Sequence, residues 1–395
     1  MPVSAPPLKG LKVVELARIL AGPWIGQTLA DLGASVVKVE APEGDDTRRW
    51  GPPFIERLRP DGTTEEVAAY FHAANRGKTS VTCDFGERAE LERLKALIAD
   101  ADVLIENFKV GGLKKYGLDY ESLKATNPRL VYCSITGFGQ DGPYAPRAGY
   151  DFVVQGVGGL MSITGEAGRE PQKVGLAVSD IFTGLYSVIA IQAALRHAEA
   201  TGQGQYIDMA LLDTQVSVLG NQNLNYLVSG KVPVQMGNAH MNIAPYEVLP
   251  VQDGFFILAV GNDGQFQRFC KVVGLDQLTT DPDFATNPAR VTNRVRLREI
   301  LVETLATWER GKLLPLLDAS AVPASPINNI AEMFDDPQVV ARSMRMDLDD
   351  GMGNKLPSVR APMVMHGTPL QYDRPSPRLG QHTEEILAEL EERGK

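Results

Sequence analysis

A single carboxylate, Asp180, stands at the start of a long apolar run of the chain. The residues from Ile181 to Leu195 predict a buried helix, followed by a Gly-rich turn and a strand over Gln205–Met209. The positive end of a helix keeps a carboxylate ionised and stabilises an oxyanion formed beside it. An ionised Asp can attack a thioester and become an acyl anhydride, which is covalent catalysis by a carboxylate. We therefore predict that Asp180 is a nucleophile.

Asp180 also has a simpler interpretation. Asp or Ser directly before an apolar-periodic run is a common helix N-cap. Ser179 could supply the cap and free Asp180, and the sequence does not decide between them. Other catalytic groups find less support, because the five histidines are scattered, no metal-spaced cluster occurs and no Ser nucleophile elbow is present. A lone histidine such as His240 is more often structural than catalytic.

The elements around Asp180 alternate between strands and helices. Residues 11–40 predict a strand, a helix that begins near Pro23, and a second strand. Further strands are predicted at Thr79–Cys83, Asp102–Ile105 and Arg129–Ile135. Asn107 and Phe108 follow the carboxyl end of one strand, where open parallel sheets bind ligands. The alternative is an ordinary loop with a capping Asn and a core Phe.

One glycine pattern, Gly137-x-Gly-x-x-Gly142, has the form of a dinucleotide-binding loop. Pro143 and Pro146 follow it, so no regular helix opens there, and no acidic residue lies at the expected later spacing. We predict a tight loop that lets another group approach the backbone, rather than a nicotinamide or flavin site.

The pattern changes after Asn221. A polar stretch to Asn242 predicts a hinge, and two apolar runs around Gln252-Asp253-Gly254 predict a hairpin. Helices are then predicted over Gln265–Val273, Arg290–Thr307 and Lys312–Ser320, and a terminal helix over Glu384–Glu392. We expect a discontinuous large domain, residues 1–224 and 326–395, and a small α+β domain, residues 225–325. The loop from Gly261 to Gly264 is a candidate mobile segment.

The composition excludes several classes of protein. The chain has 395 residues, 44% of them hydrophobic and 22% charged, which is typical of globular proteins. The net charge of −10 argues against nucleic acid as a partner. Three widely spaced cysteines indicate neither a disulfide framework nor a zinc site. The N-terminus lacks the features of a signal peptide, and Ile181–Leu195 is too short to span a bilayer. We expect a cytoplasmic protein with no membrane partner.

Several short motifs together resemble the class III CoA-transferases of the CaiB/BaiF type. The resemblance covers essentially the whole chain, in order. Its motifs are Leu-Ala-Gly-Pro (20–23), Asp-Leu-Gly-Ala-x-Val-Val-Lys-Val-Glu (31–40), Asn-Arg-x-Lys (75–78), Glu-Asn-Phe (106–108), Ser-Ile-Thr-Gly-Phe-Gly-Gln-x-Gly-Pro (134–143), Ala-Gly-Tyr-Asp (148–151), the Asp180 stretch, Thr-Gly-x-Gly-Gln (201–205) and Leu-Gly-Gln-His-Thr (379–383). Motifs at 44–54, 237–240, 259–266 and 326–329 resemble the branch that uses succinyl-CoA and glutarate.

The resemblance implies a fold, an assembly and a set of site residues. The implied fold is α/β, with a Rossmann-like large domain and a small domain in an interlocked homodimer. The implied catalytic residue is Asp180. The implied contacts to CoA are Leu20, Ala21, Asn107, Phe108, Lys115, Tyr150 and Asp151. Leu20 stands where the formyl-CoA branch has Gln, Ala148 replaces a Lys, and Lys115 replaces an Arg.

The resemblance also implies a reaction: CoA moves from an acyl-CoA to a free carboxylic acid through an aspartyl anhydride and an aspartyl-CoA thioester. We expect CoA only as a substrate, no permanently bound cofactor and no metal. A dicarboxylate needs a cation, and Arg18, Arg48, Arg49 and His240 are candidates. Gly261 and Asn262 lie in the loop that could shield the intermediates.

Two alternatives remain at this point. The α-methylacyl-CoA racemases resemble this chain but carry a His at the position of Tyr150. Racemisation needs two acid/base groups, and a phenol is a poor base at neutral pH. A transferase is therefore favoured, and a non-catalytic CoA-binding protein is the other alternative.

Overall fold

The computed structural model describes residues 5–393. Residues 1–4, at the start of the segment for which no signal peptide is expected, lie outside the described residues. The chain divides into two compact units. Unit 1 comprises Met1–Leu160, Val174–Leu227 and Pro337–Lys395, and unit 2 comprises Met161–Lys173 and Val228–Asp336.

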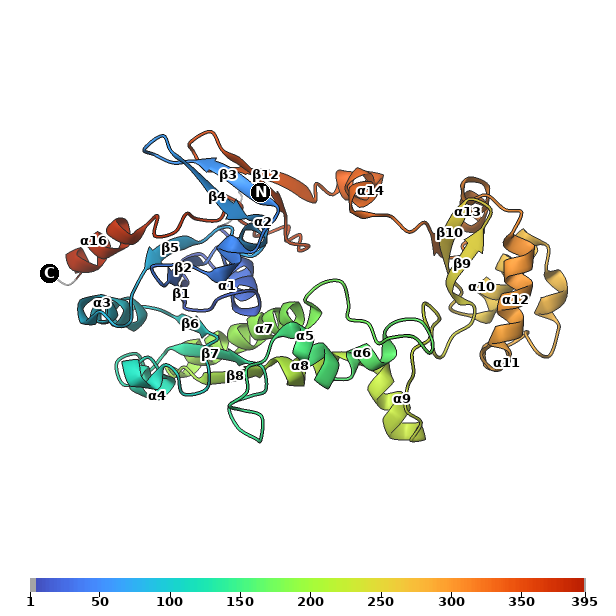
Figure 1. Cartoon of the computed structure of the whole chain (residues 1–395), viewed down its shortest axis with the longest axis horizontal. Coiled ribbons are helices and arrows are strands. Elements are labelled where there is room, and N and C mark those ends of the chain that lie inside the picture. Colours follow the sequence, from blue (N-terminus) through green and yellow to red (C-terminus); the bar gives the residue numbers. More distant parts are fainter. Residues whose placement is uncertain (1–4, 394–395) are drawn as a thin grey trace. The chain divides into compact units, whose positions relative to one another are not determined.

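Unit 1 is built on a parallel sheet with the strand order β5-β2-β1-β6-β7-β8 (Figure 1). The chain leaves β1 in one direction, through β2 to β5, and then continues from β6 in the other direction. The switch point of the sheet therefore lies between β1 and β6. The strands are β1 (Lys12–Glu15), β2 (Ser35–Glu40), β5 (Thr79–Thr82), β6 (Val103–Glu106), β7 (Val131–Thr136) and β8 (Tyr206–Ala210).

Each face of this sheet has its own core, because side chains alternate along a strand. Val13 and Val103 face a core that contains residues of α1 (Ala21–Asp31) and α7 (Val178–Thr201). Their neighbours Val14 and Leu104 face a second core with α3 (Arg88–Ala99) and α4 (Tyr120–Lys124). Unit 1 is thus a three-layer α/β structure, in agreement with the predicted class.

Helix α7 is longer than the predicted Ile181–Leu195 and is buried on one side only. Length and apolar composition alone would let it cross a membrane, but core helices share both properties. It packs on α1, β7 and β8, where Ser179, Thr183 and Ser187 are buried. Ile189 on another side is 63% exposed. The predicted buried helix is therefore buried along one side and exposed along another in the single chain.

Shorter elements complete unit 1. They are η1 (Asp46–Arg49), β3 (Phe54–Leu58), β4 (Thr64–Ala68), α2 (Ala69–His72), η2 (Lys114–Tyr116), α5 (Asp151–Val157), α8 (Leu211–Val218), α9 (Asn221–Ser229), α15 (Pro337–Ala341), β12 (Arg345–Asp349), β13 (Lys355–Val359) and α16 (Thr383–Arg393), with α6 (Leu160–Ile163) at the boundary. The predicted hinge over Asn221–Asn242 begins with the helix α9 instead.

The last segment of the chain covers the outer edge of β5. The N–H of His382 donates to the carbonyl of Ser80 at 3.0 Å, and the N–H of Gly77 donates to the carbonyl of Arg374 at 3.1 Å. The hydroxyl of Thr383 accepts from the N–H of Thr82 at 3.1 Å. The exposed edge of the sheet is therefore capped by residues far away in sequence.

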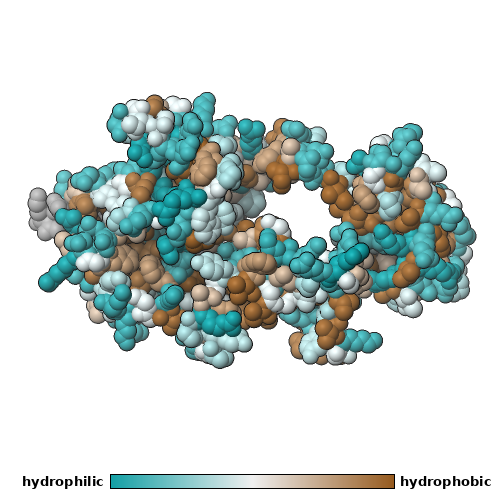
Figure 2. All heavy atoms as spheres, viewed as in Figure 1, coloured by the Kyte–Doolittle hydropathy of each residue, from teal (hydrophilic) through white to brown (hydrophobic). Residues whose placement is uncertain are grey.

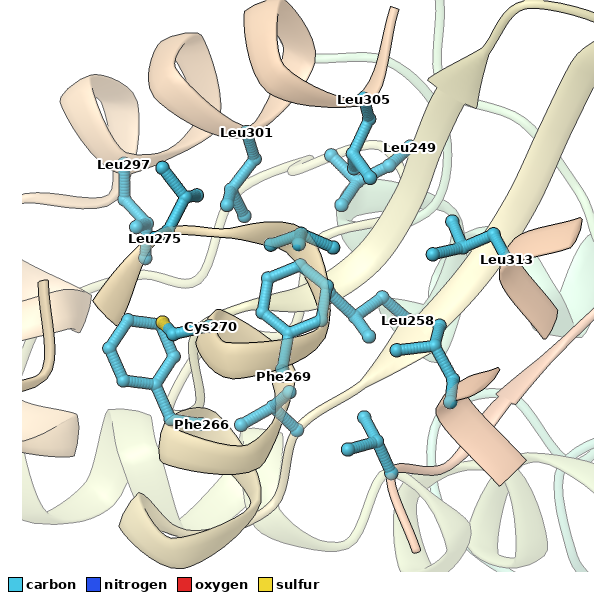
Figure 3. Packing of buried hydrophobic residues seen from close by; sticks show 14 of the residues in the cluster. Leu249, Leu258, Phe266, Phe269, Cys270, Leu275, Leu297, Leu301, Leu305 and Leu313 are labelled. Atoms are coloured by element: carbon cyan, nitrogen blue, oxygen red, sulfur yellow. The ribbon is translucent and has the colours of Figure 1, made fainter. Parts of the chain in front are cut away.

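Unit 2 has a hairpin and helices around a separate core (Figure 3). Leu297, Leu301 and Leu305 project from one face of α12 toward α10, which carries Phe266 and Phe269. This is the i, i+4 spacing of an amphipathic helix. The elements are β9 (Tyr246–Val251), β10 (Gly254–Ala259), β11 (Ala324–Ser325), α10 (Asp263–Val273), η3 (Asp276–Thr279), α11 (Asn287–Thr292), α12 (Arg294–Leu305), α13 (Arg310–Ala319) and α14 (Ile330–Asp335).

The units differ from the predicted domains at residues 161–173, 225–227 and 326–336. Residues 161–173 group with unit 2, because the Gln235 amide donates to the carbonyl of Thr164 at 2.9 Å and the N–H of Gly237 donates to that of Gly165 at 2.9 Å. Unit 2 also extends to Asp336 rather than ending at residue 325. The predicted helix Arg290–Thr307 is divided at Asn293 into α11 and α12.

Candidate active site

Two loops meet at the switch point of the sheet. The loop after β1 contains Arg18, and the loop after β6 contains Asn107. The amide of Asn107 accepts a hydrogen bond from the N–H of Arg18 at 2.9 Å and donates one to its carbonyl at 2.8 Å. Asn107 thus pairs with the backbone of Arg18 on both sides. Ligands of doubly wound sheets bind at this position.

A cavity of about 430 Å³ opens at this junction. It is bounded by the β1–α1 loop, the β6 loop, the loop after β7 and the first turn of α7. The predicted site residues that line it are Arg18, Leu20, Ala21, Asn107, Phe108, Tyr150 and Asp180. Residues up to 162 positions apart in sequence, from Arg18 to Asp180, are therefore brought together in one wall.

Asp180 is not the N-cap of α7. The cap position is Ala177, which makes no side-chain hydrogen bond, and Asp180 lies in the first turn. Within residues 5–393, no group donates a hydrogen bond to the Asp180 carboxylate, whereas the hydroxyl of Ser179 donates to Gln215 at 2.7 Å. Both capping interpretations are therefore wrong. The carboxylate of Asp180 remains available to a ligand.

Asp151, the first residue of α5, caps the start of α7 in place of a residue of α7 itself. Its carboxylate accepts from the N–H of Ser179 at 2.8 Å and from the Gln155 amide at 2.7 Å. Gln155 is fully buried and also accepts from the N–H of Val174 at 2.9 Å. Asp151 does not line the cavity. It supports the start of α7, and its contact with CoA stays a prediction.

The environment of Asp180 disfavours its charge. Burial raises the pKa of Asp180 to about 7, and the negative charge of Asp151 contributes in the same direction. Position in the first turn of a helix opposes this effect, by roughly 1 kcal/mol or less at a typical site. Asp180 is thus a poorly solvated carboxylate that titrates near neutral pH, as expected for a catalytic group.

The loop after β7 is shaped by two glycines. A Cβ built on Gly137 would collide with the Cα of Gly149 and would lie 2.9 Å from its nitrogen. Both glycines line the cavity. Gly139 and Gly142 have φ of 91° and 79°, and no helix follows them. The prediction of a tight loop with a close backbone approach is confirmed.

Three cations face the cavity. Arg18 pairs with Asp46 at 3.1 Å, with both side chains well exposed. The Arg147 guanidinium lies 4.5 Å from the Tyr144 ring centroid, and Lys109 completes the set. Local positive charge in a chain of net charge −10 favours an anionic ligand here.

A second cavity of about 420 Å³ adjoins the first, since Arg18 and Phe108 line both. It lies at the carboxyl ends of β1, β2 and β5. Its wall includes Leu16, Glu40 and Phe85. The pair of cavities suits an elongated ligand that follows this edge of the sheet.

Arg48 and Lys115 do not line the cavity of Asp180. Arg48 is buried, with its guanidinium on Glu40 at 2.7 and 2.8 Å and near the carbonyl of Pro377 at 3.3 Å. These contacts occupy the guanidinium of Arg48, and its contact with a substrate stays a prediction. Arg49 binds Asp46 at 3.3 Å on the surface. Lys115 lies over the ring of Tyr116 at 4.6 Å.

His240, Gly261 and Asn262 belong to unit 2. The His240 ring accepts from the N–H of Asn242 at 3.1 Å and packs against Tyr246. Asn262 caps α10 by accepting from the N–H of Gln265 at 2.9 Å. Next to it, Asp263 binds the fully buried Arg290 at 2.7 Å. The predicted mobile loop is therefore anchored at both Asn262 and Asp263.

Sequence reasoning missed Arg147, which lines the cavity, and Tyr70, which interacts electrostatically with Asp180. Arg147 is next to Ala148, which replaces a Lys of the family. A cation next to the replaced position could have indicated Arg147. Tyr70 belongs to none of the sequence motifs, so nothing in the sequence indicated that it lies near Asp180. Burial raises the pKa of Tyr70, and the charges of Asp180 and Asp151 add to that rise, so its phenol lies in the same electrostatic environment. Within the described residues no His, Cys, Asp and Glu side chains cluster as metal ligands.

Residues 8–383 match the model of CoA-transferase family III. The chain belongs to this family. Family III enzymes transfer CoA, and their substrates are CoA thioesters, which are elongated anions. The two cavities and their cations fit such a ligand.

Similar proteins agree with this assignment. The chain is 58% identical to a succinate–glutarate CoA-transferase of Agrobacterium fabrum, over 99% of this chain and 97% of that one. It is 41% identical to the succinyl-CoA:glutarate CoA-transferase of Homo sapiens, over 97% and 86%. A crystal structure of a CaiB/BaiF family protein from Brucella suis matches with 58% identity and a TM-score of 0.87, over 98% and 100%.

Proposed function

We propose that this family III enzyme moves CoA from succinyl-CoA to a dicarboxylate such as glutarate through covalent intermediates on Asp180. The observation that carries the proposal is the unpaired Asp180 carboxylate in the wall of the cavity at the sheet's switch point. The cations Arg18, Lys109 and Arg147 on the same wall support an acyl-CoA ligand. The names of two relatives support the choice of donor and acceptor.

The first half of the reaction loads CoA onto the enzyme. The Asp180 carboxylate attacks the thioester carbon of succinyl-CoA, and the C–S bond breaks to release CoA thiolate and leave an aspartyl anhydride. The thiolate then attacks the side-chain carbonyl carbon of Asp180. Succinate leaves, and an aspartyl-CoA thioester remains. No oxidant, reductant or proton donor is needed in this sequence.

The second half runs the same chemistry in reverse. A glutarate carboxylate attacks the aspartyl thioester and expels the thiolate, which gives a mixed anhydride. The thiolate attacks the glutaryl carbonyl, so glutaryl-CoA leaves and the Asp180 carboxylate is restored. Each tetrahedral oxyanion requires nearby donors. The first turn of α7, to which Asp180 belongs, offers backbone N–H groups and a positive helix end.

The positions of the other residues support a role for each of them. Leu20, Ala21, Phe108 and Tyr150 contact CoA, and Asn107 fixes the loop that carries Arg18. Arg18 is the candidate for the distal carboxylate of the acid, since its partner Asp46 is exposed and exchangeable. For His240, Gly261 and Asn262 of unit 2, contact with substrate stays a prediction.

The enzyme works as a homodimer without a permanently bound cofactor or metal. Large apolar side chains on the surface of the single chain support a partner subunit. In Figure 2 a brown patch lies over α9, where Leu227 is 72% exposed. On α7, Tyr186 and Ile189 are 44% and 63% exposed. Three buried free cysteines support a reducing, cytoplasmic setting.

The experiment is intact-protein mass spectrometry after mixing with succinyl-CoA alone and quenching in acid. We expect an adduct of CoA mass that maps to Asp180. Asp180→Asn should fold normally, form no adduct and lose about 10³-fold or more in kcat, the scale found on removing a nucleophile. Acceptor acids are then compared in a panel of glutarate, malate, itaconate and oxalate.

Two outcomes would contradict the proposal. Full turnover of Asp180→Asn would exclude this residue as the nucleophile. Absence of an adduct, together with deuterium uptake into a 2-methylacyl-CoA in heavy water, would identify a racemase instead. Affinity for CoA without adduct, transfer or exchange would leave only a binding protein.

A further inference from the structure

Ile19 holds an unusual backbone conformation in the wall of the active-site cavity. Its φ is +71°, in the left-handed region that a β-branched residue rarely enters. Ile19 lies between Arg18 and Leu20, and all three line the cavity. Such a conformation costs free energy, so neighbouring groups must hold it in place.

Two side chains, Asn107 and Asp45, hold this turn by hydrogen bonds to its backbone. Asn107 pairs with both backbone groups of Arg18. The carboxylate of Asp45 accepts the N–H of Ile19, at 3.2 Å to Oδ2 and 3.4 Å to Oδ1. Asp45 belongs to the segment 44–54, which the proposed chemistry does not use.

Asp45 is itself fixed inside the protein. It is 1% exposed and lies 3.1 Å from the Nζ of Lys38, which is fully buried. Lys38 also donates to the carbonyl of Ala17 at 2.9 Å and to Glu15 at 3.2 Å. Although burial opposes ionisation, Lys38 and Thr47 hold the pKa of Asp45 below its usual value. The carboxylate of Asp45, which tethers Ile19, is thus a charged and rigid hydrogen-bond acceptor.

The turn sets where α1 begins relative to Asp180. Helix α1 starts at Ala21, directly after the turn. A Cβ built on Gly184 would lie 3.0 Å from the carbonyl oxygen of Ala21 and 3.2 Å from the Cβ of Trp24. Asp180 and Gly184 are four residues apart and therefore share a face of α7. A shift of the turn would move the wall beside the nucleophile.

We propose that Asp45 is a positioning residue that holds the strained Ile19 turn, so that the acyl-CoA cavity beside Asp180 is formed before the ligand arrives. The inference rests on the proposed function for the identity of the ligand. A preformed wall binds more tightly, because less ordering is required on binding. Asp45 makes no contact with the cavity. It acts only through Ile19.

The test is a double-mutant cycle with Asp45→Ala and Ile19→Gly. Glycine adopts positive φ without a Cβ penalty, so it keeps the turn without a tether. We expect Asp45→Ala to raise the Kd for CoA, measured by calorimetry, and the KM for succinyl-CoA by about tenfold, with kcat changed less. In the presence of Ile19→Gly the same substitution should change both values less than about threefold.

A matched control is Ser80→Ala. Ser80 is fully buried and donates to Glu40 at 2.7 Å in the same charged cluster, but it does not reach Ile19. This variant should lower the thermal midpoint and leave Kd and KM unchanged. Equal effects of Asp45→Ala with and without Ile19→Gly would overturn the inference. So would a tenfold rise of Kd in Ser80→Ala.

A second pair of variants covers the case in which Asp45→Ala does not fold. Ile19→Gly and Ile19→Ala remove the same side chain, but only alanine retains the Cβ penalty at positive φ. We expect a higher thermal midpoint for Ile19→Gly, and equal midpoints would show that the turn is not held. A wild-type chain that binds CoA and transfers nothing contradicts the proposed function alone. A chain that binds no CoA contradicts both.

Discussion

Two carboxylates, Asp151 and Asp180, interact at the start of α7. Asp151 accepts the N–H of Ser179, and so it anchors the first turn of the helix that carries Asp180. The same charge disfavours ionisation of Asp180. A poorly solvated carboxylate is more basic and therefore a stronger nucleophile once ionised. In the proposed mechanism, Asp151 thus both supports the helix and activates Asp180.

The pH dependence should report this arrangement. Asp180 must lose its proton to attack, and its pKa is raised to about 7. The rate of adduct formation at limiting succinyl-CoA should therefore rise about tenfold per pH unit below pH 7 and level off above it. Asp151→Asn removes the like charge, so the midpoint should move to lower pH. Stopped-flow mixing followed by acid quench measures both profiles.

Asp141→Asn is the control for this prediction. Asp141 is an exposed acid in the loop after β7, and it is not among the charges that act on Asp180. The midpoint should stay in place when it is neutralised. An Asp151→Asn profile that overlays the wild type would refute the coupling between the two carboxylates.

For single residues, the sequence reveals the type and the local neighbours of a side chain but not its partners in the fold. Asp180 could be singled out because a carboxylate before an apolar run is visible in the sequence. The sequence could not show that Asp180 has no capping role. The carboxylate that accepts the N–H of Ser179 at the start of α7 is Asp151, 29 positions before Asp180. The ion pair of Arg48 with Glu40 could not be predicted for a similar reason, because only the fold brings the two side chains together.

At the scale of elements, glycines set how closely loops and helices approach. Gly184 lets the start of α1 lie against α7. Gly137 and Gly149 let two segments of the same loop cross with their backbones in contact. Each close approach lies in or beside the cavity wall. The shape of the site thus depends on the lack of a side chain at these glycines as well as on the side chains that line the cavity.

Gly137→Ala tests this dependence. The new Cβ would meet the backbone of Gly149, which has no flexible end to move away. We expect a loss of about 1–3 kcal/mol in the free energy of unfolding, the usual cost of overpacking, and a weaker Kd for CoA. Urea unfolding and calorimetry measure the two effects.

Gly175→Ala is the matched control. Nothing lies within 4 Å of a Cβ at Gly175, and its φ is not in the left-handed region. This variant should keep the stability and the affinity of the wild type. If Gly137→Ala behaved like Gly175→Ala, the crossing of the two loops would not be required.

Periodicity predicted the elements better than their ends. The hairpin and the strands of the sheet were found within one or two residues, since apolar runs bounded by Gly and Pro mark them clearly. The start of α7 was missed because Val178 and Ser179 lie before the apolar run, and tertiary packing extends the helix over them. The break between α11 and α12 at Asn293 has only a weak local signal.

At the scale of the whole molecule, apolar surface remains uncovered in the single chain. Phe182, Leu185, Tyr186 and Ile189 on α7 are each exposed by 38% or more. Patches of this kind mark interfaces. Composition could not reveal them, because an apolar residue that faces a partner has the same identity as one that faces the core.

Sedimentation equilibrium should give about twice the chain mass of 42.9 kDa. Ile189→Asp places a charge in the apolar patch and should lower the dimer fraction at micromolar concentration. Val295→Asp is the control, since Val295 is 70% exposed between Arg294 and Arg296. A monomeric wild type, or equal effects of the two substitutions, would argue against α7 as an interface.

The segment that covers β5 has a consequence for synthesis on the ribosome. A nascent chain emerges from its N-terminus, so β5 leaves the exit tunnel about 300 residues before its partner His382. The core residues of unit 2, from Leu249 to Val322, emerge in the interval. Unit 2 can therefore pack while the sheet of unit 1 still has an open edge. Premature termination before Arg374 would leave that edge permanently unpaired, which is a template for aggregation.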